Sequence, residues 1–482
     1  MAVDVVWFKR DLRLRDHAPL AEAVAQGRPL ILLYVHEPSI WDLPDHAPRH
    51  RRFVEECLVD LQQQLVPHGR SMLVCEAEMA EVLAFLHQRW GIHTLHSHRE
   101  TGLADTYARD RALTAWCQVN GVRWSEHDRD GVQRGRRDRQ GWMEQWHYTM
   151  QAPKAHVDRA LLAARMLPPE QLDNPFPPQD PLPPDEAFQA GGEHAGQQWL
   201  RSWVEGRISR YAASISKPAA SRSGCSRLSP YLAWGCLSAR QVYQAQERAV
   251  LRSAEGRNFR AFTDRLRWRD HFIQKFEMED RMEHEHLHPA FEAYPWSAEE
   301  EPLRRWETGT TGYPMVDACM RSLIATGYLN FRMRAMLVSF ATQVLGVHWK
   351  RPALHLAQQF LDYEPGIHYP QVQMQAGTTA IHTLRLYDPV KQGLDHDPEG
   401  SFIRTWVPEL RALRGPLVHT PWALTPLERM AYRLDYPEPV VPYPTALSEA
   451  RDRVYAFRKG LAFDHTARRI VQRHTIPGSR RT

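Results

Sequence analysis

The pattern of hydrophobic positions divides the chain into two unlike parts. In the first third, short runs rich in β-branched and aliphatic residues alternate with stretches whose apolar residues keep helical spacing. Repeated strand–helix units of this kind predict a parallel sheet covered by helices on both faces. The predicted strands are Val3–Phe8, Pro29–Val35, Ser71–Cys75, Ile92–His96 and Val122–Glu126.

The second part is helical in pattern and is separated from the first by a proline-rich passage. Apolar residues keep helical spacing over 259–276, 316–323 and 336–344. Residues 167–184 contain eight prolines, a density that excludes a helix or a central strand and is typical of an extended connector. We therefore predict a Rossmann-like α/β domain with a parallel sheet over 1–135, a connector over 136–200 and an all-helical domain over 201–482.

Composition narrows the class of protein. The chain has 482 residues, 43% hydrophobic and 24% charged, which is ordinary for a folded soluble protein of two domains. A net charge of +4 is too small for histone-like binding, so any nucleic-acid binding must use a local patch. Of the 61 basic residues only 7 are Lys, and there are 16 Trp. The Arg excess reflects either genomic base composition or phosphate recognition, and the Trp excess either core packing or stacking and electron transfer.

Targeting signals and metal-binding patterns are missing from the sequence. No apolar stretch approaches the length of a bilayer-spanning helix, and the first residues lack a signal-peptide core. The six cysteines form no C-x-x-C pair and show no metal-ligand spacing. We therefore expect a cytoplasmic, monomeric protein with no membrane segment, no disulfide framework and no metal.

The turns after the predicted strands carry little glycine. The first strand runs into Lys9–Arg13 and not into a glycine-rich fingerprint, so a standard dinucleotide site is not supported there. The segment 97–102 follows the fourth strand, at the carboxyl end of the sheet where ligands bind in such folds.

Two segments of the helical part carry candidate binding chemistry. In 223–238, small hydroxyls and backbone amides precede an apolar helical run, which suits either phosphate binding or a plain capped helix. On a helix, Arg265, Trp268, Arg269 and Phe272 share one face. Such a face can clamp a phosphate and stack on a base, whereas a solvated face explains the arginines but not Trp268.

Two further segments combine acidic residues with turns. In 306–334, Asp317 and Arg321 stand four residues apart and can simply pair on a helix. In 360–369, Asp362 and Glu364 are followed by Pro-Gly, which fits a loop that accepts hydrogen bonds from the ribose or ring N–H of a ligand.

These segments together resemble the DNA photolyase/cryptochrome family of flavoproteins, over nearly the whole chain. The motifs are VWFKRDLRLRD at 6–16, SRLSPYLAWG at 226–235, WRD at 268–270, TGYPMVDA at 311–318 and FIRTWVPEL at 402–410. The resemblance implies an N-terminal antenna domain and a C-terminal FAD-binding domain holding a bent FAD. It also implies UV-damaged DNA as the partner, and it allows a second antenna chromophore, a folate or a flavin, of open identity.

The resemblance implies cofactor and electron-transfer positions. Trp296 and Trp349 resemble the outer and middle members of the family's electron-transfer chain, while Val372 fills the inner position; Tyr369, Tyr328 or a cellular reductant are open substitutes. Cys225 stands where the family usually has Thr. The implied FAD contacts are Tyr211, Cys225, Ser226, Arg227, Leu228, Ser229, Arg269, Arg334, Asp362, Glu364 and His368.

The implied substrate pocket departs from the family pattern. Trp268 resembles the ring that stacks on a flipped-out dimer, but Arg265 replaces a Glu, Met374 a Trp and His368 an Asn. The implied DNA or substrate contacts are Arg265, Trp268, Arg269, Phe331, Met374 and Lys391.

The leading hypothesis is a photolyase that splits pyrimidine dimers with blue light and reduced FAD. The alternative is a cryptochrome-type photoreceptor that binds FAD without repair, which Val372, Met374 and Arg265 favour. A third class, a helical nucleic-acid-binding protein without flavin, predicts a colourless protein.

Overall fold

The N-terminal part is a parallel sheet, as predicted. The computed structural model describes residues 2–250, 256–379, 385–459 and 463–476. Its sheet has the order β3-β2-β1-β4-β5, and every pairing is parallel. The strands are β1 (Val3–Phe8), β2 (Leu30–His36), β3 (Leu73–Glu76), β4 (Ile92–His98) and β5 (Arg123–His127). The predicted strands are confirmed, with ends shifted by a residue or two.

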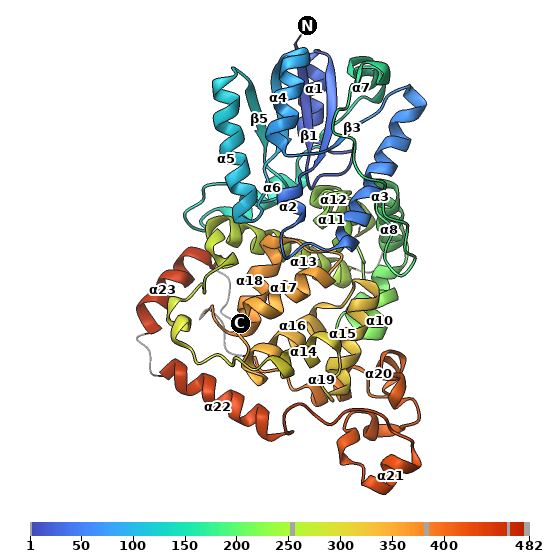
Figure 1. Ribbon diagram of the computed structural model, residues 1–482, viewed down its shortest axis with the longest axis vertical. Coiled ribbons are helices and arrows are strands. Elements are labelled where there is room, and N and C mark those ends of the chain that lie inside the picture. Colours follow the sequence, from blue (N-terminus) through green and yellow to red (C-terminus); the bar gives the residue numbers. More distant parts are fainter. Residues whose placement is uncertain (1, 251–255, 380–384, 460–462, 477–482) are drawn as a thin grey trace.

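Helices cover both faces of this sheet (Figure 1). Along β1, Val5 and Trp7 belong to one hydrophobic core, and Val6 and Phe8 to another, because successive side chains of a strand point to opposite faces. The helices of this part are α1 (Ala18–Gln26), α2 (Pro38–Trp41), α3 (Pro48–Leu65), α4 (Met79–Trp90), α5 (Ala104–Val119), α6 (Trp142–Gln151) and α7 (Arg159–Arg165). Residues 167–184 form no α-helix or strand, only the 3₁₀ turn Pro169–Gln171.

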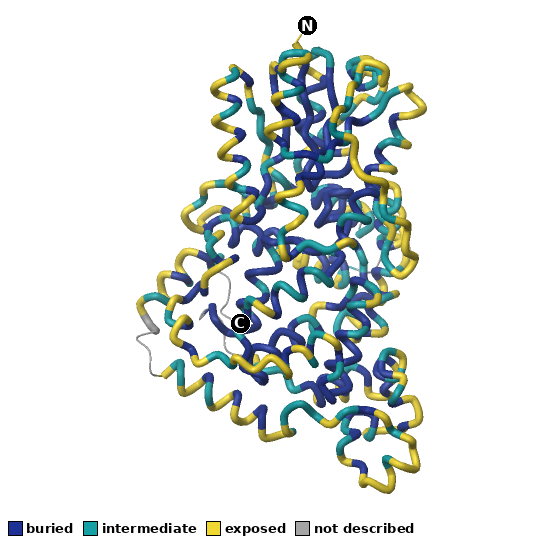
Figure 2. Tube along the Cα trace, in the orientation of Figure 1, coloured by how far each residue is buried: buried dark blue, intermediate teal, exposed yellow. Residues whose placement is uncertain are grey.

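The rest of the described chain is helical. Figure 2 shows its buried centre beneath the sheet, with exposed residues along the outer helices. The helices are α8 (Glu193–Glu205), α9 (Tyr211–Ser214), α10 (Pro218–Gly224), α11 (Ser229–Ala233), α12 (Ala239–Val250), α13 (Gly256–Met278), α14 (Glu300–Thr308), α15 (Pro314–Thr326), α16 (Phe331–Ser339), α17 (Lys350–Gln359), α18 (Pro365–Ala376), α19 (Pro389–His396), α20 (Ser401–Trp406), α21 (Pro426–Ala431), α22 (Thr445–Lys459) and α23 (Phe463–His474). A single π-helical turn, Phe340–Val344, continues α16.

The motif after β1 joins the two parts. The guanidinium of Arg10 donates to the carbonyl of Ala233 at 3.3 Å, and Arg13 donates to the carbonyl of Gly235 at 2.8 Å. Gly235 has φ +74°, and a Cβ there would lie 2.1 Å from the Arg10 carbonyl oxygen. Only glycine fits this backbone approach. The residues after β1 thus hold the sheet against the helical part.

The pairing of Asp317 with Arg321 is wrong. Asp317 is buried and accepts hydrogen bonds from the backbone N–H groups of Thr311 and Gly312 at 2.8 and 3.0 Å. Arg321 instead contacts Glu409 at 2.9 Å. The carboxylate satisfies loop amides that would otherwise be buried without partners, so this motif shapes the turn before α15.

Two expectations about covalent and membrane features can be compared with the structure. All six cysteines are free and buried. Among the described residues, no helix is both long and apolar enough to cross a bilayer.

Candidate functional site

The helical part contains a pocket of about 290 Å³. Its walls come from α9, α11, α13, α16, α18 and the loops before them, so residues far apart in the sequence meet there. Most of its exposed lining is apolar, with a few charged groups, as is typical of cofactor pockets. The predicted residues that line it are Tyr211, Cys225, Ser226, Arg227, Leu228, Ser229, Arg265, Trp268, Arg269, Phe331, Arg334 and Asp362.

An Arg–carboxylate pair forms one charged wall of the pocket. The two terminal nitrogens of Arg334 donate to the two oxygens of Asp362 at 3.0 and 2.9 Å. The Nε of Arg334 donates to the carbonyl of Leu329 at 2.7 Å, and its guanidinium lies 4.0 Å from the centre of the Phe360 ring. All three guanidinium nitrogens are thereby engaged, which holds both charges at one place on the pocket wall.

The turn between α10 and α11 forms a second wall. Arg227 adopts φ +56°, and its guanidinium lies 3.7 Å from the ring centre of Tyr328. The guanidinium of Arg207 donates to the carbonyl oxygens of Cys225 and Ser226, which fixes the turn. Burial raises the pKa of the Cys225 thiol to about 12, so this side chain lines the pocket as a neutral thiol.

The mouth of the pocket carries a cationic, aromatic stripe on α13. Trp268 is 42% exposed, and the guanidinium of Arg265 lies 5.2 Å from its ring centre. Arg269 lies one turn further and is buried, where it contacts Asp130 at 2.9 Å and Asp270 at 2.7 Å. The helical face predicted from spacing is present, but Arg269 is held by carboxylates inside the protein.

Several pocket-lining side chains keep a buried polar atom with no hydrogen-bond partner in the described part of the chain. They are Nε of Arg227, Oδ1 of Asn330 and Oε1 of Gln371. Unsatisfied buried groups are costly and uncommon in proteins.

Comparison with known proteins assigns the family. Residues 262–456 match a family model described as the FAD binding domain of DNA photolyase, and residues 4–133 match one described as DNA photolyase. A deoxyribodipyrimidine photo-lyase from Streptomyces griseus is 30% identical over 475 residues, which cover 94% of this chain and 98% of that protein. The chain belongs to the DNA photolyase/cryptochrome family.

Solved structures share the two-domain architecture of this photolyase-family chain. A cryptochrome from Synechocystis sp. PCC6803 superposes with a TM-score of 0.84 at 25% identity, over 94% of this chain and 99% of that one. An archaeal photolyase from Sulfolobus tokodaii with two FAD molecules superposes with a TM-score of 0.73 at 22% identity, over 94% of this chain and all 100% of the other. The predicted fold class is confirmed.

FAD is the cofactor of this photolyase-family domain. The pocket fits it, because its apolar walls suit a ring system, and Arg227, Arg334 and Asp362 place charged groups on the lining.

Four predicted contacts lie outside the pocket. Glu364 is buried beside Arg129 at 3.4 Å and lines a different, smaller cavity. His368 is buried, and its Nε2 donates to the carbonyl of Ala353 at 2.8 Å; burial lowers its pKa to about 4. Lys391 lines a separate cavity of about 440 Å³ with Arg332 and Arg385. Met374 is half-buried on α18 and is not among the residues that line the pocket.

Residues that the sequence did not single out also form the walls. Phe262 and Leu266 face the pocket from α13, and Ile367 and Gln371 face it from α18. The two residues of each pair stand four positions apart and therefore lie on one face of their helix. This spacing is the only signal for them in the sequence, and it does not distinguish a pocket wall from any other buried helix face.

The two predicted electron-transfer residues lie away from the pocket lining. Trp349 is fully buried, whereas Trp296 is half-buried. Val372 packs in the same hydrophobic core as Trp349 and Tyr369, whose ring centres are 6.3 Å apart.

The carboxyl end of β4 borders a small cavity. The cavity beside Thr101 has a volume of about 20 Å³, against roughly 300–1,000 Å³ for a typical cofactor site. Arg109 lies there against Glu37, Glu100 and Asp110 at 2.8–2.9 Å. The segment 97–102 therefore lies beside buried ion pairs rather than beside a chromophore-sized cavity.

One buried cluster in the sheet domain has metal-ligand residue types. His17 and His98 both contact one oxygen of Asp11, at 2.9 and 2.6 Å. Nδ1 of His17 accepts the backbone N–H of Leu20 at 3.1 Å, so the proton of its neutral ring is on Nε2, toward Asp11. Burial lowers the pKa of His98 to about 3. Nδ1 of His98 forms a hydrogen bond with this carboxylate oxygen, and Nε2 of His17 lies 2.9 Å from the same oxygen.

Proposed function

We propose that this protein is an FAD-dependent photolyase that splits UV-induced pyrimidine dimers in DNA under blue light. The observation that carries the proposal is the position of Trp268, a large exposed indole at the mouth of the flavin pocket with Arg265 against it. Relatives named photolyase and cryptochrome both match the chain, so repair is proposed on the geometry of this mouth.

The mouth of the pocket suits a pyrimidine dimer that has been extruded from the duplex. A dimer cannot meet a cofactor inside the duplex, so it must leave the stack before it reacts. The ring of Trp268 can stack on a flipped base, a contact worth about 1–3 kcal/mol per base. Arg265 places a positive charge at the same opening, where it can contact a phosphate or a base.

The flavin, when bound, supplies light absorption and the transferred electron. The residues of this chain bind the flavin, orient it and tune its electronic properties. Arg334 and Asp362 present one positive and one negative group at the pocket wall, and Trp349 and Trp296 are the proposed electron donors that keep the cofactor reduced. Because Val372 occupies the inner position, we propose that Trp349 is the innermost indole of this route.

The second candidate is a photoreceptor of the cryptochrome type. Arg265 and Val372 favour it, since both depart from the family's repair pattern. A flavin-loaded protein that binds neither cyclobutane nor 6-4 lesions would favour the photoreceptor.

We further propose that the protein acts in the cytoplasm as a monomer on UV-damaged DNA.

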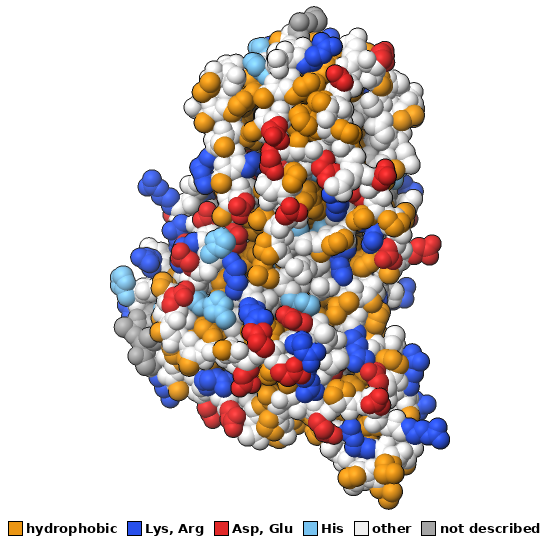
Figure 3. Space-filling view, viewed as in Figure 1, with side chains coloured by type: hydrophobic (Ala, Val, Ile, Leu, Met, Phe, Trp, Pro, Cys, Tyr) orange, Lys and Arg blue, Asp and Glu red, His pale blue; other side chains and the backbone are white. Residues whose placement is uncertain are grey.

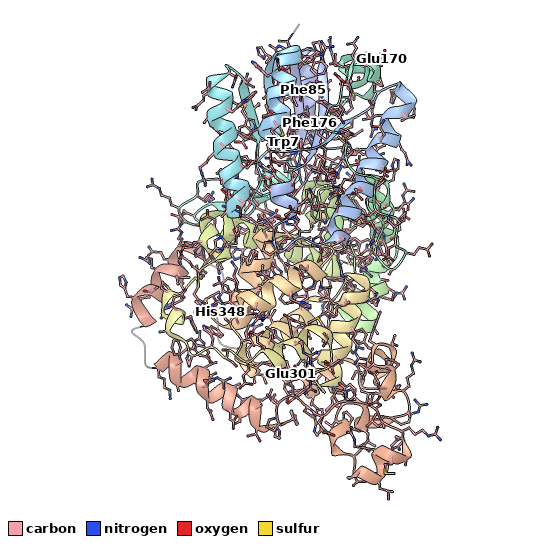
Figure 4. All side chains as sticks on the ribbon, viewed as in Figure 1. Trp7, Phe85, Glu170, Phe176, Glu301 and His348 are labelled. Atoms are coloured by element: carbon pink, nitrogen blue, oxygen red, sulfur yellow. The ribbon has the colours of Figure 1, made fainter. Side chains whose placement is uncertain are left out.

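The test uses the purified flavoprotein and oligonucleotides that carry one lesion each. Trp268→Ala is expected to lower lesion binding about tenfold or more, because it removes the stacking ring. Arg265→Glu, which places the family's usual residue at the mouth, is expected to change lesion binding because it reverses a charge there. Arg304→Glu, on the exposed side of α14 beside Glu301 (Figure 4), is the matched charge reversal and should leave binding unchanged. If Trp268→Ala and Arg265→Glu both bind and repair like the native protein, the mouth is not the lesion site.

A further inference from the structure

A histidine lies between the two proposed electron donors. The ring of His286 stacks on Trp296, with ring centres 5.7 Å apart and planes 5° from parallel. The indole N–H of Trp349 donates to Nδ1 of His286 at 3.0 Å. Backbone pairing of Ser297 with Val347 holds the two tryptophan-bearing segments side by side. His286 therefore touches one indole by its face and the other by a hydrogen bond.

These contacts define the protonation state of His286. Its Nδ1 accepts a hydrogen bond, so the proton of the neutral ring is on Nε2. Nε2 lies 3.2 Å from Nε2 of His348, which is half-buried and labelled in Figure 4. Burial, and to a lesser extent His348, lower the pKa of His286 to about 3. At neutral pH a free lone pair thus faces the N–H of Trp349.

We propose that His286 is the proton acceptor for oxidised Trp349, an inference that rests on the proposed electron route. Trp349 gives one electron to the light-excited flavin and its indole proton to Nδ1 of His286. One N–H bond breaks on the indole and one forms on the imidazole. The positive charge moves from Trp349 to His286, and a neutral indole radical remains. Return of one electron and one proton restores both residues.

The low basicity of His286 in the resting protein does not oppose this transfer. Burial disfavours the imidazolium because it creates a charge in a medium of low dielectric. Once Trp349 has lost an electron, the buried charge already exists, and the proton only moves it between adjacent rings.

Proton transfer also decides where the radical stays. An imidazolium stacked on Trp296 raises the energy of a second positive charge on that ring, since like charges in contact repel. Trp349 must also recover its proton before Trp296 can reduce it. His286 thus confines the radical to Trp349. Return of the electron from the flavin to Trp349, which would waste the absorbed light, then also requires the proton to return from His286.

The test is flash photolysis of the flavoprotein, read by the visible spectrum of the tryptophan radical, whose cationic and neutral forms absorb differently. The native protein should show the neutral radical, and Trp349→Phe should lose it. His286→Asn keeps an acceptor for the indole N–H but has no basic nitrogen, so it should show the radical cation. His348→Asn is the control: it alters the neighbouring ring and keeps the neutral radical. A radical cation in the native protein, or no tryptophan radical at all, overturns the assignment.

A measurement in the dark tests the same geometry without any light reaction. Nitrogen NMR of histidine-labelled protein should show His286 with the proton on Nε2, and Trp349→Phe should shift its Nδ1 signal. A proton on Nδ1 contradicts the inference. Repair by chemically reduced protein does not use Trp349, so failure of that repair defeats the proposed function, whereas a wrong radical spectrum defeats only the role of His286.

Discussion

At the scale of single residues, the site depends on a few fixed charges in an apolar pocket. The Arg334–Asp362 pair is the best defined of them, because both carboxylate oxygens and all three guanidinium nitrogens are engaged. A pair of this geometry holds its position when a ligand binds, which suits the tuning of a cofactor.

Asp362→Asn tests this pair. It leaves the half-buried Arg334 without a carboxylate and removes one acceptor oxygen, which should cost about 2 kcal/mol of flavin-binding free energy. Flavin content after dialysis, read by absorbance, measures the loss. Asp264→Asn is the matched control, since Asp264 is an exposed partner of Arg267 on α13. Equal flavin content in both variants would show that the pair does not hold the cofactor.

Many of the residues named by motif resemblance line the pocket, but the resemblance could not separate neighbours on one helix. Successive residues of a helix point about 100° apart, so on α18 Ile367 and Gln371 face the pocket while His368 faces Ala353. Arg269 was placed correctly on its face, but its partner Asp130 comes from a distant part of the chain. Periodicity along one segment carries no information about such partners.

At the scale of elements, β-branched runs and amphipathic spacing were sufficient to predict the strands and the helices that contain residues 259–276 and 316–323. The short helices α9, α10 and α11, which shape the pocket, were not predicted individually, because a few residues carry no period. The π-helical turn at Phe340–Val344 also has no signal in the pattern. These elements form through tertiary packing, which local sequence does not encode.

The interior of α13 gives a pH-dependent prediction. Lys275 is buried, and burial, with the nearby charge of Arg139, lowers its pKa to about 7. Between pH 7 and the ordinary pKa of lysine, the unfolded chain binds this proton and the folded protein does not. The free energy of unfolding therefore rises with pH across this range. Below about pH 7 it is lowered by the full cost of burying a protonated Lys275.

Lys275→Met should remove that dependence. Near pH 6 the variant is expected to be more stable than the native protein by an amount on the order of 3 kcal/mol, and near pH 10 the two should be similar. Thermal unfolding midpoints at both pH values check this. A difference that is the same at pH 6 and pH 10 would contradict a depressed pKa for Lys275.

At the scale of the whole molecule, the sheet domain and the helical domain share a continuous core, and the residues after β1 contact the chain that leads into the flavin pocket. Figure 3 shows acidic and basic side chains interspersed over the face in view, in keeping with the small net charge. The sequence resemblance included the motif after β1, but its role in domain contact is visible only in the structure.

Gly235→Ala tests this contact. The added Cβ would lie 2.1 Å from the Arg10 carbonyl oxygen and 2.4 Å from the Asp11 Cα, so backbone must move. We expect destabilisation of at least about 3 kcal/mol, with faster proteolysis between the domains. Gly121→Ala is the control, because Gly121 has a similar φ of +67° and nothing within 4 Å of its added Cβ. It should lose only about 1–2 kcal/mol. Equal shifts in the two thermal midpoints would show that φ alone matters.

DNA repair by this member of the photolyase/cryptochrome family can be measured directly. The measurement is the loss of cyclobutane and 6-4 lesions from oligonucleotides incubated with the FAD-loaded, chemically reduced protein, in blue light and in darkness. If the protein is a photolyase, a dimer lesion is lost in light and none is lost in darkness. A protein that contains reduced FAD and leaves both lesions intact in light would contradict the proposed function.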